Sequence, residues 1–126
     1  MTTPPRPDPL TSQAYADALL QRTGDELGRV LQQLAAALTP FPAFLGMPTI
    51  QAVEVDPPLK DPGRGCVVVC SDGKLYELLV TMIPGPPGVG GVDALEEFNE
   101  LDLPPAEYVA YAYRAIQALA NHLKRR

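Results

Sequence analysis

Residues 65–83 read GCVVVCSDGKLYELLVTMI, two runs rich in apolar and β-branched residues on either side of the pair Asp72-Gly73. An Asp-Gly pair between such runs is typical of a β-hairpin with a two-residue turn. The sequence therefore predicts two antiparallel strands joined at this pair. With a two-residue turn, Val69 lies opposite Tyr76, and this register assigns every side chain of the hairpin to a face.

In that register both faces of the hairpin are apolar. One face carries Val67, Val69, Tyr76, Leu78, Val80 and Met82. The other carries Cys66, Val68, Cys70, Leu75, Glu77, Leu79 and Thr81. Sheets that are apolar on both faces are normally covered on both, so we expect helices on the Val67/Tyr76 face and a second subunit on the other. Glu77 is either solvated there or buried against a partner group.

Proline divides the rest of the chain into elements. The 15 prolines fall into five clusters, and proline ends helices and is confined to strand ends and edges. The stretches between clusters predict a helix capped by Thr11 or Ser12 and running to about Leu38, a strand over 49–56, the hairpin, a short acidic helix over 93–101, and a helix after Pro105. The first helix is either continuous or restarts at the capping-box pattern that begins at Thr23.

These elements predict an α+β fold. We expect a three-stranded antiparallel meander packed against N- and C-terminal helices, in the order α-β-β-β-short α-α. Residues 1–10 are expected to form a mobile Pro-rich tail, and 11–126 a single domain. A chain of 126 residues buries enough surface to fold without metal or disulfide staples.

The two cysteines do not indicate a cross-link or a metal site. Cys66 and Cys70 lie four residues apart on one predicted strand, which separates their Cα atoms by about 13 Å. That distance is too long for a disulfide within the chain. A structural zinc site needs a second pair of ligands that the sequence does not offer. We expect no metal and no cofactor.

Charge excludes some classes of partner. The net charge is −5, which disfavours nucleic acid, because phosphate binding needs a basic surface. Residues 75–113 hold seven acids and no base, whereas 114–126 hold four bases and no acid. The acidic stretch over 93–107 is either a solvated face or a surface for a basic protein. No apolar run is long enough for a membrane span and no secretory signal is visible, so the expected compartment is the cytoplasm.

A glycine-rich segment follows the hairpin. Residues 85–92 read GPPGVGGV, which resembles the phosphate-binding loop of AAA-type ATPases over six residues. The segment departs from that motif at Gly91, where the motif has Lys, and at Val92, where it has Ser or Thr. We interpret it as a Pro/Gly-rich connector, with anion binding at the next element's N-terminus as the second interpretation.

Two further groups of aromatic residues have open interpretations. The linker over 40–48 contains Phe41 and Phe44, which either fill the core or form an exposed patch. Tyr108, Tyr111 and Tyr113 are spaced so that they cannot all lie on one face of a helix. At least one of them is therefore expected at the surface or in an interface.

Function is predicted as protein interaction without catalysis. No spacing indicates a nucleophile with its base and orienting acid, so we expect an adaptor-like domain that acts as a homodimer through the Cys66/Leu79 face or the tyrosine-bearing helix. The alternative is a small-molecule-binding domain or small enzyme with a pocket between sheet and helices. The candidate interface or pocket residues are Cys66, Val68, Cys70, Glu77, Leu79, Tyr108, Tyr111 and Tyr113.

Overall fold

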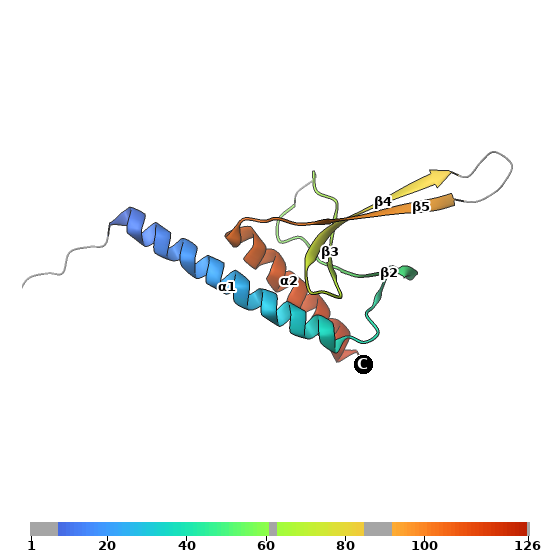
Figure 1. The fold of residues 1–126 in the computed structure, drawn as a ribbon, viewed down its shortest axis with the longest axis horizontal. Coiled ribbons are helices and arrows are strands. Elements are labelled where there is room, and N and C mark those ends of the chain that lie inside the picture. Colours follow the sequence, from blue (N-terminus) through green and yellow to red (C-terminus); the bar gives the residue numbers. More distant parts are fainter. Residues whose placement is uncertain (1–7, 61–62, 85–91, 126) are drawn as a thin grey trace, which may run out of the picture.

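The protein has an α+β fold, seen in a computed structural model that describes residues 8–60, 63–84 and 92–125. The elements are α1 (Pro9–Ala37), β1 (Ala43–Phe44), β2 (Met47–Glu54), β3 (Cys66–Cys70), β4 (Leu75–Pro84), β5 (Val92–Glu100) and α2 (Pro105–Lys124). The five strands form one antiparallel sheet in the order β1-β2-β3-β4-β5. The two helices lie side by side and run in the same direction, while β4 and β5 extend beyond the rest of the sheet (Figure 1).

The β3–β4 hairpin forms where the sequence predicts it, but its register differs by one residue. Val69 lies opposite Leu75 rather than Tyr76. The Gly73 N–H donates to the Cys70 carbonyl at 2.9 Å and the Cys70 N–H donates to the Lys74 carbonyl at 3.2 Å. The connection therefore has three residues and ends on Gly73, whose φ of +77° is in the left-handed region. A three-residue loop ending in this conformation is a common alternative to the two-residue turn.

The shift moves the side chains of β4 to the opposite faces of the sheet. Leu75 now lies with Val67 and Val69 under the helices, whereas Tyr76 lies on the other face. Helices cover the Val67 face as predicted, and the placement of Tyr76 beneath them is wrong. The apolar side chains form two clusters, one between the helices and the sheet and one on the sheet's other face. The second cluster consists of Phe44, Ile50, Ala52, Val68 and Leu78, with Met47, Cys66, Cys70, Tyr76 and Val80 against it.

The prediction of three strands is wrong at both ends of the sheet. β1 and β2 form an additional hairpin with a two-residue turn, in which Phe44 lies opposite Met47. The short acidic helix predicted over 93–101 is instead β5, which pairs with β4 along its whole length. β4 is long and apolar, and β3 pairs with only one of its edges. Pairing with β5 satisfies the backbone N–H and C=O groups on the other edge. This pairing overrides the weak local preference of the acidic segment for helix.

α1 is one continuous helix, so that alternative is confirmed. It begins at Pro9, with Asp8 rather than Thr11 or Ser12 as the N-cap: the Leu10 N–H donates to Asp8 Oδ1 at 2.8 Å. Gly24 does not interrupt the helix. A Cβ on Gly24 would lie 3.1 Å from Cδ1 of Tyr108. The glycine therefore makes room for an aromatic ring of α2, which brings the two helices close together.

The aromatic linker over 40–48 contributes to both apolar clusters. Phe41 is buried in the first and Phe44 in the second, which confirms that these rings fill the core. None of the described helices has the length and apolar character needed to span a membrane. The glycine-rich segment over 85–91 and the first seven residues of the predicted tail lie outside the described residues, so the predictions made for these two segments lie outside them as well.

Candidate interaction surfaces

β5 has an open edge within the part of the chain that the structure describes. It pairs with β4 on one side and is the last strand of the sheet. The Leu101 N–H donates to the Leu75 carbonyl at 3.0 Å. Since antiparallel pairs alternate along a ladder, the backbone groups of Glu96, Phe98 and Glu100 point away from β4. A strand edge with unpaired donors and acceptors can accept another strand.

The side chains of β5 are exposed and mostly acidic. Leu95 is 59% exposed and Phe98 38% exposed, and the carboxylates of Glu96, Glu97 and Glu100 also face solvent. The Phe98 ring meets the Tyr76 ring edge-on, with centroids 6.1 Å apart. This contact fixes the orientation of the Phe98 ring. β5 therefore presents an ordered aromatic side chain flanked by acidic side chains.

A groove of about 750 Å³ lies between the β1–β2 side of the sheet and the second half of α2. Its α2 wall includes Arg114, Lys124 and Arg125, which belong to the basic end of the sequence. Glu54 on β2 and Asp56 just after it contribute two acids to the opposite wall. The apolar residues of the lining are Phe44, Leu45, Val53 and Ile116 together with several smaller side chains. The groove thus combines apolar surface with a basic wall.

The strand at the side of this groove also has an open edge. β1 pairs with β2 at Met47 and Gln51, and no described strand pairs with the outer edge of β2 beyond Gln51. The Val55 N–H donates to the Val67 carbonyl at 2.9 Å. By the same alternation, the backbone groups of Ala52 and Glu54 point away from β3.

The predicted site residues on β3 lie in the second apolar cluster. Val68 is fully buried there, whereas Cys66 and Cys70 are half-buried free thiols. Burial raises the pKa of Cys66, and burial together with the charge of Asp72 raises the pKa of Cys70 to about 11. A raised pKa keeps a thiol protonated near neutral pH, which makes it a poor nucleophile and metal ligand.

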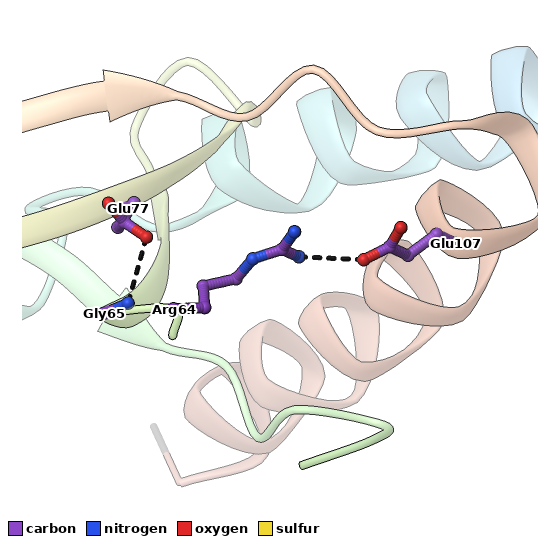
Figure 2. Close-up of polar contacts among 4 residues, drawn as sticks. All are labelled: Arg64, Gly65, Glu77 and Glu107. Carbon is purple, nitrogen blue, oxygen red and sulfur yellow. Dashed lines mark hydrogen bonds and ion pairs between the residues drawn. The ribbon is translucent and has the colours of Figure 1, made fainter. Parts of the chain in front are cut away.

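Glu77 is half-buried and bound to the chain itself. Its Oε2 accepts a hydrogen bond from the Gly65 N–H at 2.9 Å. Arg64, next to Gly65, reaches the other way and its Nη1 donates to Glu107 Oε1 of α2 at 2.9 Å (Figure 2). The Arg64 guanidinium also lies over the Tyr111 ring, 5.5 Å from its centroid. These contacts connect β3, β4 and α2. They explain why a glutamate at position 77 can be half-buried, since its carboxylate has a hydrogen-bond donor within the chain.

The remaining predicted site residues do not converge. Leu79 lies on the helix side of β4, opposite to the face of Cys66, so the predicted Cys66/Leu79 face does not exist. Tyr111 is buried in the first core cluster, and Tyr108 packs at Gly24 and Gly28. Burial raises the pKa of Tyr108. Only Tyr113, which is 57% exposed, lines the large groove.

No metal site is evident in the described residues, which contain no cluster of three His, Cys, Asp or Glu side chains able to hold an ion. The described residues also line a hollow of about 540 Å³ between α1 and the start of α2 and another of about 280 Å³ beside Arg64. Comparison of the chain with family models, with curated proteins and with solved structures finds no match.

Sequence reasoning missed both the β5 edge and the groove. The distribution of charge identifies the acidic and basic segments. A helix over 93–101, however, does not predict that Leu95 and Phe98 lie on opposite faces, as they do in the strand β5. One signal was present: a ten-residue apolar strand followed by a Pro/Gly-rich connector is typical of another hairpin. The groove has no local signature, because β1, β2 and α2 are far apart in sequence.

Proposed function

We propose that this protein is a non-enzymatic protein-interaction domain that acts as a homodimer. The observation that carries the proposal is the projecting strand β5, whose edge is open in the described structure and whose Leu95 and Phe98 are exposed. Exposed edge strands are places where protein chains join. The free thiols Cys66 and Cys70 suit a reducing compartment, and we retain the cytoplasm as the proposed location.

A small-molecule site has weaker support. The groove is open and holds apolar and charged side chains along its walls, whereas ligand sites usually enclose most of the ligand. The raised pKa values of the cysteines also disfavour nucleophilic use of either thiol at neutral pH. Protein–protein interfaces combine an apolar centre with a polar rim, and the lining of this groove likewise holds both kinds of side chain.

The oligomeric state tests the proposal. Multi-angle light scattering at tens of micromolar chain is expected to give twice the chain mass of 13.5 kDa. Replacing Phe98→Lys removes an apolar contact and places a positive charge on the open strand, which is expected to raise the dimer dissociation constant at least about tenfold. The matched control is Leu59→Lys, because Leu59 is 79% exposed but lies outside β5 and the groove. A monomeric wild type would contradict the proposed function.

A further inference from the structure

We propose that, in the homodimer, β5 of each copy occupies the groove between β2 and α2 of the other copy. This inference rests on the proposed function and names the surfaces that form the contact. Both surfaces belong to the same chain but lie at opposite edges of its sheet. A chain cannot therefore fill its own groove with its own β5, whereas two copies related by a two-fold axis form the contact twice.

Charge supports the match between the two surfaces. β5 presents Glu96, Glu97 and Glu100, and the α2 wall of the groove presents Arg114, Lys124 and Arg125. The acids of the groove, Glu54 and Asp56, lie on the strand wall. Glu96 and Glu100 lie on one face of β5 and Glu97 on the other. A β5 strand that turns the face of Glu96 and Glu100 towards α2 therefore brings two carboxylates to positive charge. Complementary potentials of this kind steer association and fix its orientation.

Backbone hydrogen bonding and shape support the same arrangement. The groove runs along the part of β2, at Ala52 and Glu54, that β1 leaves unpaired. A strand seated there can pair with β2 through the open edge of β5 and join the two sheets. Leu95 and Phe98 lie on opposite faces of β5. One face of the seated strand therefore meets the apolar lining that includes Ile116, and the other meets the lining that includes Leu45. Figure 1 shows that β4 and β5 project from the body of the fold, which leaves them accessible to another copy.

Direct pairing of β5 with β5 of the other copy is disfavoured. An antiparallel pair centred on Phe98 places Glu96 of each copy opposite Glu100 of the other. Centring the pair on Glu96 places that carboxylate opposite itself. Like charges directly opposite each other destabilise a strand pair. The acidic edge of β5 therefore favours contact with a basic surface over pairing with β5 of the other copy.

Charge exchange tests the assignment. One variant carries Glu96→Lys and Glu100→Lys, which lie on the same face of β5, and a second carries Arg114→Glu and Lys124→Glu. Each variant alone sets like charges against each other in both contacts, so its dimer dissociation constant is expected to rise at least about tenfold in low salt. A 1:1 mixture restores opposite charges in both contacts and is expected to form a mixed dimer within about threefold of wild-type affinity. The control carries Arg22→Glu and Lys60→Glu, which reverse two charges outside both surfaces.

The outcomes separate this inference from the proposed function. A mixed dimer formed by two variants that are each monomeric supports reciprocal docking. A dimeric wild type whose charge variants also remain dimeric overturns the docking and leaves the homodimer standing. Variants that dissociate alone but do not associate when mixed also overturn it. A wild type that is monomeric overturns both. Circular dichroism of each variant checks that loss of association does not arise from loss of fold.

Discussion

Gly73, at the end of the β3–β4 loop, rests against the backbone of Gln32 in α1. A Cβ added to Gly73 would lie 2.8 Å from both Cα and N of Gln32, a separation that real Cβ atoms do not adopt. Gly73 also has a φ of +77°, which L-residues with a Cβ rarely adopt. The same glycine therefore sets the hairpin register and lets the hairpin approach the helix.

Replacing Gly73→Ala is expected to lower the free energy of unfolding by about 3 kcal/mol, through backbone strain and overlap with α1. The matched control is Gly46→Ala. Gly46 has a φ of +74°, but a Cβ added there would meet no neighbouring side chain or backbone within 4 Å. We therefore expect Gly46→Ala to lower the free energy of unfolding by about 1 kcal/mol, from strain alone. Urea unfolding measures both. Equal losses would show that contact with Gln32 contributes nothing.

A cross-strand disulfide tests the register of the hairpin. Cys66 lies directly opposite Leu78, and opposite Cα atoms in an antiparallel pair are about 5.5 Å apart or closer, within disulfide range. In a Cys70→Ala background, Leu78→Cys is therefore expected to lose both free thiols on mild oxidation. Leu79→Cys is expected to keep them, because position 79 faces the other side of the sheet. The reverse result would indicate the two-residue turn.

The β1–β2 turn contains a strained leucine. Leu45 has a φ of +46° and is 72% exposed. Asparagine tolerates this conformation better than leucine does, so Leu45→Asn is expected to stabilise the fold by about 0.5–1 kcal/mol. Leu59→Asn, at an exposed leucine without positive φ, is expected to change stability little. Thermal unfolding distinguishes the two, and a destabilised Leu45→Asn would refute the strain.

The ion pair between Arg64 and Glu107 is expected to contribute measurably to stability. The ion pair joins the segment just before β3 to α2, and the two side chains are 20% and 40% exposed. A double-mutant cycle with Arg64→Leu and Glu107→Gln is expected to give a coupling free energy of about 0.5–1 kcal/mol. The comparison pair is Arg29 with Glu26 on α1, whose side chains are 67% and 59% exposed. Its coupling is expected to lie below about 0.5 kcal/mol. Similar couplings in both cycles would argue against a special role for Arg64.

Alkaline pH is expected to weaken the fold. The pKa of Cys70 rises from an ordinary value of 9.0 to about 11 in the folded chain, mainly through burial. The unfolded chain therefore releases this proton first. The stabilising effect of the protonated thiol is complete below pH 9 and is lost as pH rises towards 11. Urea unfolding at several pH values measures this slope, and Cys70→Ala is expected to flatten it. An unchanged slope in that variant would assign the pH dependence to other groups.

Local sequence was sufficient for the elements with strong periodicity or punctuation. Asp72-Gly73 located the central hairpin, and the proline clusters separated the helices from the strands. The apolar residues of the hairpin predicted that helices cover the face of Val67. These features depend on residues close in sequence, whose propensities and turn chemistry act locally.

The candidate surfaces depended on contacts between distant residues. A one-residue difference in the β3–β4 loop exchanged the faces of Tyr76 and Leu75, and so removed the predicted Cys66/Leu79 face. Pairing with β4 made a strand of an acidic segment that local preference assigned to a helix.

Composition and local pattern therefore determined the fold class and the positions of the charged segments. Tertiary packing alone decided which side chains reach the surface, because a strand's faces follow from its register and a register depends on both partners. The groove with its basic wall likewise exists only because α2 packs beside β2.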